Sequence, residues 1–390
     1  MWRVATVLVC LLVTHAGAVD DGFVPLAGGP DLRHWQTMGA GTWDWQDGAI
    51  HCDGQGSGWL RSERVYEDFT LRFEYRIAPG GNSGVWLRAP AQGRQSAVGL
   101  EFQIMGDVTA TPDVGSTGAL YDMLAPRVNA AHPAMEWNEV EISCIGPRVR
   151  AVLNGQELYD VDLQDPLFNA AVPMGRRPSE RLTRGFLGLT NHGSEVWYRN
   201  LRIREEPEEG FEPLFNGVGL EGWRAVGDGW SAVGGLLTGR GGADQRLVLG
   251  REVENYVLRL EYRLSPGAAG AVRLRAAEDS TRHRMDVVLA DDAGREPGLS
   301  TSGALRGLGA PRVNAAFVAG EWNDLEIEHR DVWLAVRLNG VPVLDGSIYW
   351  LSGFYRPPMR GTVSLLASTG TVEFRHMRLK ALPRETRMPG

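Results

Sequence analysis

The sequence contains little that would suit a membrane-spanning, nucleic-acid-binding or helical protein. Its apolar N-terminal run, Val4 to Val13, is about half of the ~20 residues that a membrane-spanning helix needs. The formal charge at pH 7 is −8, and arginines alternate with acidic residues in segments such as LRFEYRI, whereas phosphate binding needs a concentrated basic face. Long helical periodicity is also missing. These absences argue against stable membrane insertion, a nucleic-acid partner and a helical fold.

The N-terminus predicts export. Arg3 precedes the apolar run, and the small residues Ala16, Gly17 and Ala18 follow it, which is the order found in signal peptides. We expect cleavage after Ala18, so that residues 1–18 are removed and the mature protein is periplasmic or extracellular. A membrane anchor is the alternative, but the apolar run is short for one.

The rest of the chain contains one pattern twice. FTLRFEYRIAPG from Phe69 matches YVLRLEYRLSPG from Tyr256, EWNEVEI matches EWNDLEI, and both copies contain APRVNAA. The boundaries that follow are a first domain at 20–204, a linker at 205–210 and a second domain at 211–383.

Within each copy, apolar and polar residues alternate with the period of a β-strand. In residues 69–77 every second residue is apolar or aromatic, and most of the residues between them are charged. Further strands are expected in the first copy at 85–88, 100–105, 140–144, 149–153, 186–190 and 196–203. The pattern predicts an all-β protein made of two tandem antiparallel β-sandwiches.

Two cysteines, Cys52 and Cys144, remain after the expected cleavage. An oxidising compartment would permit a disulfide between them. Both are missing from the matching positions of the second copy, where Gly239 and His329 stand, so the two cysteines occur together or not at all. The sequence leaves open a disulfide or two buried free thiols.

The first copy also has an extra segment between its LNG sequence and its last strands. This segment, Asp165 to Arg184, contains the basic sequence GRRPSERLTR. We consider two interpretations, a loop that reaches over a substrate and an ordinary solvated basic loop.

Polar residues gather at three places in the first copy. Asn82 and Ser83 follow a glycine-rich turn in PGGNSGVWL. Glu101 and Gln103 alternate with apolar residues in GLEFQIMGD, so they project from the face opposite the core. His192 precedes a glycine turn in LTNHG. Each place alone has an ordinary structural explanation as a turn or a solvated strand.

The second copy provides an internal control, because it keeps the strand pattern and has lost most of these polar groups. Only Glu101 keeps a carboxylate, as Asp286. Joint loss is explained better by one shared site in the first copy than by independent drift. The other replacements are Ala269 for Asn82, Gly270 for Ser83, Arg273 for Trp86, Val288 for Gln103, Arg306 for Tyr121, Ala367 for Asn191 and Ser368 for His192.

The first copy contains, in order, FVPLAGGPDLRHW, FEYRIAPGGNSGVWLRA, GLEFQIMGD, TGALYDMLAPRVNAA and GFLGLTNHGSEVWYRNLRI. These segments resemble the 3-keto-disaccharide hydrolase domain family, almost continuously from Phe23 to Arg204, and residues 211–380 resemble the same domain in degenerate form. The resemblance implies a concanavalin A-like jelly-roll fold in each copy. It also implies cleavage of a sugar–sugar bond after an upstream sugar 3-dehydrogenase has converted the C3 hydroxyl to a ketone.

A C3 ketone acidifies the C2 proton, so a base can remove it and the C1 substituent can leave before water adds. We hypothesise that Glu101 is the base and that His192 is the acid or orients the base. A divalent metal on these two residues is an alternative stabiliser of the enolate, but no compact ligand motif supports it. The residues expected to bind substrate are Asn82, Ser83, Trp86, Gln103, Asp107, Tyr121 and Asn191, the two aromatic rings by stacking on a sugar.

A second hypothesis is a lectin-like carbohydrate-binding module that uses the same face without turnover. Fold alone does not separate binding from catalysis. For the second domain we expect an interaction or scaffolding role, because its matching face has lost most of the polar set.

Overall fold

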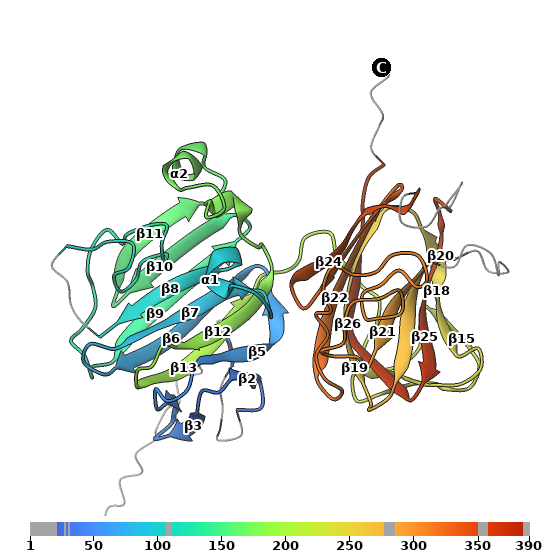
Figure 1. Cartoon of the computed structure of the whole chain (residues 1–390), viewed down its shortest axis with the longest axis horizontal. Helices are drawn as coiled ribbons and strands as arrows, with labels where there is room; N and C mark the ends of the chain where they lie inside the picture. The colour runs from blue at the N-terminus through green and yellow to red at the C-terminus, as the bar shows by residue number, and fades with distance from the viewer. Residues whose placement is uncertain are drawn as a thin grey trace, which may run out of the picture.

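The structure is a computed structural model, which describes residues 22–26, 29, 32–106, 111–276, 285–349 and 358–384. Two antiparallel β-sandwiches of the concanavalin A-like jelly-roll kind lie side by side, joined by a short connection (Figure 1). The expected signal peptide, residues 1–18, and Asp107 lie outside the described residues. The described part of the chain has no helix that is long and apolar enough to span a membrane.

Each sandwich pairs an eight-stranded sheet with a five-stranded sheet. In the first copy the larger sheet has the order β11-β10-β9-β6-β13-β4-β3, with β1 beside β13, and the smaller has the order β2-β5-β12-β7-β8. The strands are β1 (Val24–Pro25), β2 (Trp35–Gly39), β3 (Trp43–Gln46), β4 (Ala49–Cys52), β5 (Gly58–Tyr66), β6 (Phe69–Ile77), β7 (Asn82–Ala89), β8 (Leu100–Met105), β9 (Asn138–Ile145), β10 (Arg148–Leu153), β11 (Gln156–Asp162), β12 (Gly185–Asn191) and β13 (Val196–Glu205).

The second copy repeats this topology strand for strand. Its larger sheet has the order β24-β23-β22-β19-β26-β17-β16, with β14 beside β26, and its smaller sheet has the order β15-β18-β25-β20-β21. The strands are β14 (Glu212–Pro213), β15 (Trp223–Val226), β16 (Trp230–Val233), β17 (Leu236–Arg240), β18 (Arg246–Val253), β19 (Tyr256–Leu264), β20 (Ala269–Ala276), β21 (Met285–Ala290), β22 (Trp322–Arg330), β23 (Trp333–Leu338), β24 (Val341–Ser347), β25 (Gly361–Thr369) and β26 (Thr371–Ala381). The predicted all-β fold of two tandem sandwiches is confirmed.

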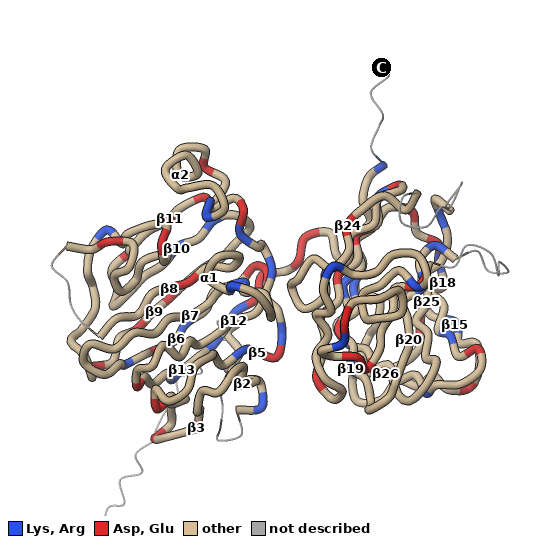
Figure 2. Tube along the Cα trace, in the orientation of Figure 1, with Lys and Arg blue, Asp and Glu red and all other residues tan. Residues whose placement is uncertain are grey.

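Alternation along the strands builds a separate core in each sandwich. On β6 the alternate residues from Phe69 to Ile77 are buried, whereas Arg72, Glu74 and Arg76 are half-buried. Removing apolar surface from water is the main stabilising term in such a core. The bounds expected for β6 and β8 agree with the structure. Basic and acidic residues are interspersed along both sandwiches (Figure 2).

A buried arginine occupies the same place in both sandwiches. Arg88 has a φ of 52° and donates hydrogen bonds to the carbonyl oxygens of Glu67 and Gly146, both at 2.8 Å, and to the Asp68 carboxylate at 3.1 Å. Arg275, with a φ of 44°, binds the equivalent carbonyl groups of the second copy. A buried guanidinium is tolerated only when its donors find acceptors. Both copies therefore satisfy the same interior requirement.

The extra segment 165–184 forms α2 (Pro166–Ala171) and the 3₁₀ turn η1 (Pro178–Glu180). Its Arg181 donates to the carbonyl oxygen of Ser96, in the short helix α1 (Gln95–Val98), at 3.0 Å. Its last residue, Arg184, binds Asp324 of the second sandwich at 2.5 and 2.6 Å. The C-terminal end of the segment is thus attached to α1 and to the second sandwich, whereas most of its other residues are exposed.

Cys52 and Cys144 are buried free thiols. They lie on β4 and β9, which are separated by β13 and β6 in one sheet. Three strand spacings amount to about 14 Å, and a disulfide needs Cα atoms within about 7 Å. The disulfide alternative is therefore wrong. Burial raises the pKa of each thiol to about 11, so both stay protonated at neutral pH.

Candidate functional site

The candidate residues of the first copy gather on its five-stranded sheet. Five residues lie opposite one another across this sheet, one on each strand in the order β2, β5, β12, β7 and β8. They are Gln36, Arg61, Gly188, Trp86 and Glu101. Cross-strand partners share one face of a sheet, and we call this side the outer face, because its opposite side packs on the core. Neighbouring strands lie about 4.8 Å apart. Trp86 is therefore the direct neighbour of Glu101.

Glu101 and His192 meet on the outer face. The Glu101 side chain is 4% exposed, and its Oε1 atom lies 3.5 Å from Nε2 of His192, whose side chain is 39% exposed. Within the described residues, this Oε1 atom has no hydrogen-bond partner. Leaving a buried oxygen without a donor is destabilising, and such exceptions are typical of functional sites. The two residues hypothesised to be catalytic are thus brought together.

Gly84, on β7, leaves room for the Glu101 carboxylate. A Cβ atom at this position would lie 2.6 Å from Oε1 of Glu101 and 3.1 Å from the carbonyl oxygen of Phe102. A side chain here would displace the carboxylate or the strand. The second copy has Ala271 at this position, opposite a strand that carries the shorter Asp286. The sequence prediction assigned no role to Gly84, although this glycine-to-alanine difference was visible.

Asn82 and Gln103 form an amide pair beside the carboxylate. Nε2 of Gln103 donates to Oδ1 of Asn82 at 2.9 Å, and the backbone N–H of Asn82 donates to Oγ of Ser194 at 2.9 Å. Asn82 is the first residue of β7 and is half-buried, so it is held in the strand and not in an exposed turn. Each amide keeps one further group, the nitrogen of Asn82 and the oxygen of Gln103, that can meet a ligand.

The aromatic side chains divide into a buried pair and an exposed ring. Trp86 is 9% exposed and packs edge-to-face on Trp59, with ring centroids 5.0 Å apart. This burial argues against open stacking of Trp86 on a sugar ring. Tyr121 is 36% exposed, and its backbone N–H donates to the Glu101 carbonyl at 2.9 Å, so its ring remains suited to that role. Trp59 was missed by the sequence prediction.

Ser83 and Asn191 have structural roles that argue against contact with substrate. Ser83 is fully buried, and its hydroxyl donates to the Thr190 carbonyl at 2.7 Å and lies 2.8 Å from the Tyr198 hydroxyl. Asn191 is buried and donates to the carbonyl oxygen of Gln55 at 2.8 Å. Adjacent residues of a strand point to opposite faces, so Ser83 and Asn82 cannot both lie on the outer face.

Metal ligands are few at this place. Glu101 and His192 provide two donors, and the described residues contain no group of three or more His, Cys, Asp or Glu side chains arranged around a metal position. Protein metal sites generally provide at least three such ligands. We therefore assign no step to a metal. Asp107, predicted to bind substrate, lies outside the described residues.

The fold and the loss of these residues in one copy define a jelly-roll protein with a single candidate site. The model of the 3-keto-alpha-glucoside-1,2-lyase-like domain family matches residues 22–204 and again residues 210–380. The chain therefore belongs to this family, in two tandem copies.

Individual relatives are distant. The 3-keto-disaccharide hydrolase of Bacteroides thetaiotaomicron is 22% identical over 228 residues, which are 47% of this chain and 78% of the relative. A solved structure from Parabacteroides distasonis, provisionally called a glycosyl hydrolase, is 24% identical with a TM-score of 0.43, covering 48% of this chain and 95% of that one. A carbohydrate-binding module from Bacillus subtilis is 13% identical with a TM-score of 0.33, covering 44% and 96%.

Proposed function

We propose that the first sandwich cleaves 3-keto-disaccharides or related 3-keto-glycosides, with Glu101 as the base. The observation that carries the proposal is the Glu101 carboxylate, which is buried and faces His192, and one of whose oxygens has no hydrogen-bond donor among the described residues. Membership of the family supports a 3-keto-glycoside as the substrate class.

The proposed reaction is an elimination followed by hydration. Glu101 accepts the C2 proton, and the resulting enolate expels the C1 substituent as the C1–O bond breaks and a C1–C2 double bond forms. His192 gives a proton to the leaving oxygen. Water then adds its oxygen to C1, C2 regains a proton from Glu101, and the remaining proton of the water returns to His192. General acid–base steps of this kind need groups within hydrogen-bond reach of the atoms that exchange protons.

The other outer-face groups hold the substrate in this proposal. The side-chain nitrogen of Asn82 donates to a sugar hydroxyl or to the enolate oxygen, the side-chain oxygen of Gln103 accepts from a sugar hydroxyl, and Tyr121 stacks on a ring. The substrate needs its ketone beforehand, so an oxidoreductase of the sugar 3-dehydrogenase class must act upstream. We further propose that the reaction takes place after export, on the basis of the signal-like residues 1–18.

A matched pair of substrates tests the proposal. The purified chain is offered a glucose disaccharide and its 3-keto derivative, and monosaccharide release is followed by mass spectrometry. We expect release from the keto form alone. Turnover of neither, with measurable binding of the intact disaccharide, would favour the carbohydrate-binding module. Equal turnover of both would contradict the elimination, because the C2 proton is acidic only beside a ketone.

A further inference from the structure

Phe317 of the second sandwich reaches the outer face of the first. It lies just before β22 and packs against the small hydrophobic cluster that contains Trp59, Trp86 and Phe186. The ring centroids of Phe317 and Phe186 are 6.0 Å apart. Because Trp86 is the direct neighbour of Glu101 across the sheet, the second sandwich adds a side chain to the hydrophobic cluster that adjoins the candidate base.

Arg61 is held between the two sandwiches. Its guanidinium carbon lies 4.5 Å from the ring centroid of Phe186 and 4.0 Å from that of Phe317. Its Nη2 atom donates to the Glu321 carboxylate at 3.4 Å. Burial, with only 2% of the side chain exposed, lowers the pKa of Arg61 to about 10, although Glu321 and Glu63 oppose the shift. Arg61 is therefore a buried cation at neutral pH that lies between one aromatic ring of each sandwich.

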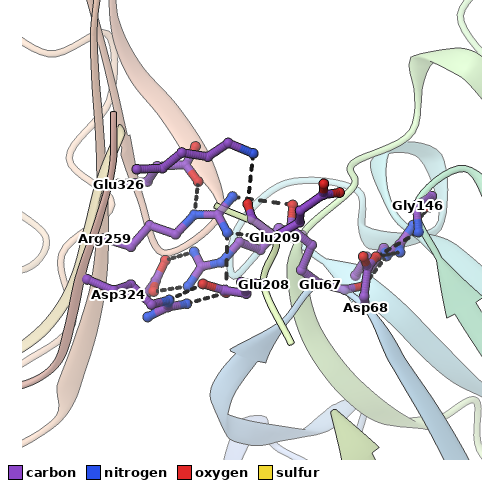
Figure 3. Close-up of polar contacts among 12 residues, drawn as sticks. Glu67, Asp68, Gly146, Glu208, Glu209, Arg259, Asp324 and Glu326 are labelled. Atoms are coloured by element: carbon purple, nitrogen blue, oxygen red, sulfur yellow. Dashed lines mark hydrogen bonds and ion pairs between the residues drawn. The ribbon is translucent and has the colours of Figure 1, made fainter. Parts of the chain in front are cut away.

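Charged contacts fix the position of the second sandwich. Arg184 donates to both carboxylate oxygens of Asp324, and Arg259 is paired with Glu326 at 2.8 Å and also with Glu67 (Figure 3). The Arg184–Asp324 pair is almost fully buried, and the buried Arg259 pairs with Glu67 of the first sandwich as well as with Glu326 of its own sandwich. Buried ion pairs lose stability steeply when one partner moves away, so they hold the two sandwiches in one orientation and keep Phe317 in place.

The contact residue Phe317 is particular to the second copy. The corresponding residue of the first copy is His132, which is exposed and binds the carbonyl oxygen of Trp137 at 2.9 Å. Glu321 is a glutamate in both copies, because it corresponds to Glu136. Glu136 is exposed, however, whereas Glu321 accepts a hydrogen bond from Arg61 of the other sandwich. The same loop thus faces solvent in the first copy, whereas in the second copy it packs against the outer face of the first sandwich.

We propose that the second sandwich is a positioning element for the site of the first, and that Phe317 and Glu321 act through Arg61 and the Trp59–Trp86 pair. The inference rests on the proposed function, because it places the substrate on the outer face. Removing Phe317 opens one side of Arg61 and of the cluster that contains the two tryptophans. The side chains next to Glu101 then lose part of the packing that holds them in place. The effect is expected on substrate binding, because none of these side chains exchanges a proton with the substrate.

A spectroscopic experiment tests the contact without any substrate. The full chain is labelled with 5-fluorotryptophan, and the fluorine resonances of Trp59 and Trp86 are assigned with Trp59→Phe and Trp86→Phe. Phe317→Ala should shift both resonances, and in Phe317→Leu both should lie close to their positions in the parent protein. His132→Ala is the matched control at the corresponding position and should shift neither. Unmoved resonances in a folded Phe317→Ala protein would overturn the inference.

A kinetic experiment tests the consequence. With the 3-keto disaccharide, Phe317→Ala and Glu321→Gln should each raise KM about five- to tenfold and leave kcat within about twofold, the pattern of lost binding. Glu136→Gln is the control for Glu321→Gln and should change neither. Unchanged KM in an active protein would overturn the inference and leave the proposed function intact. If the parent shows no turnover, the proposed function fails, and the affinities of the same variants for the intact disaccharide decide whether the second sandwich positions a binding face.

Discussion

The outer faces of the two five-stranded sheets show how one fold keeps a site in one copy and loses it in the other. Register aligns the two faces residue by residue. At three aromatic positions of the first copy the second has arginines, namely Arg246 for Trp59, Arg273 for Trp86 and Arg306 for Tyr121. The buried arginine on the inner side of the sheet is kept in both. The interior has thus been preserved while the outer face has changed in character.

The carboxylates make the difference explicit. In the second copy Arg273 donates to both oxygens of Asp286, at 2.7 and 3.0 Å, and both side chains are buried. In the first copy the neighbour of Glu101 on the adjacent strand is Trp86, which donates nothing to it. A carboxylate held by a bidentate guanidinium is a poor base. The second copy therefore holds its carboxylate in a charge pair, whereas one oxygen of the first copy's carboxylate has no hydrogen-bond partner in the described structure.

Glu101→Gln should have the largest effect on turnover, because it removes the basic group and keeps its size. We expect turnover of the 3-keto disaccharide to fall by about 10²- to 10⁴-fold, because an amide cannot accept the C2 proton. The thermal midpoint should not fall, since the lost oxygen has no hydrogen-bond donor in the described structure. Kinetics and calorimetry check both. Near-normal turnover would shift the role of base to His192 or Asp107.

The converse substitution, Arg273→Met, tests the second copy. It leaves Asp286 buried without its partner, which should lower the free energy of unfolding by about 3–5 kcal/mol. The double variant with Asp286→Asn should recover much of that loss. Denaturant unfolding gives the values. A loss below about 1 kcal/mol, the range of exposed ion pairs, would mean that the pair does not stabilise this face.

Gly84→Ala introduces into the first copy the residue of the second. The new Cβ would lie 2.6 Å from the Glu101 carboxylate, and misplacement by about 1 Å can lower turnover by about 10²-fold. We expect a loss of about ten- to a hundredfold. Ala271→Gly makes the reverse change in the second copy and should leave turnover unaltered. Equal activity of Gly84→Ala and the parent would show that the carboxylate does not need this space.

The smallest expected effect concerns His329, which stands where the first copy has Cys144. Both of its ring nitrogens are buried without a partner in the described residues, and burial, together with Arg275, holds its pKa well below the usual 6.5. Protonation therefore favours the unfolded state. The contribution of neutral His329 to the free energy of unfolding is fully present above about pH 6.5. It decreases below that pH, by at most about 1.4 kcal/mol per pH unit. His329→Cys should flatten this dependence in calorimetry between pH 7 and 5, and an unchanged slope would assign it to other groups.

Periodicity and self-comparison were sufficient for much of this architecture. Alternation predicted β6 and β8 with their correct bounds, because one face of each is buried and the strand period is fixed at two. The same rule separates Asn82 from Ser83, since neighbours on a strand face opposite sides, and its use there would have removed Ser83 from the candidates. The repeat also contained the signal for Trp59, which an arginine replaces in the second copy.

Other features could not be predicted from the sequence. The contact of Phe317 with the outer face depends on how two sandwiches pack, and no local pattern encodes that orientation. The 3.5 Å approach of His192 to Glu101 depends on a turn beyond β12 and on the space beside Gly84. Periodicity gives the face on which a side chain lies, whereas distances between side chains depend on packing across the sheet.

The two buried thiols allow the opening of one domain to be observed separately from the other. In the described residues the cysteines are Cys52 and Cys144, and both lie in the core of the first sandwich. A thiol reagent can reach them only when that core opens, so the labelling rate under native conditions reports local or global opening of the first sandwich alone. Mass spectrometry after timed labelling would then show whether a ligand on the outer face, or a change in the second sandwich, makes those openings rarer. The labelling rate of the two native thiols therefore measures how often the candidate catalytic domain opens, without any introduced probe.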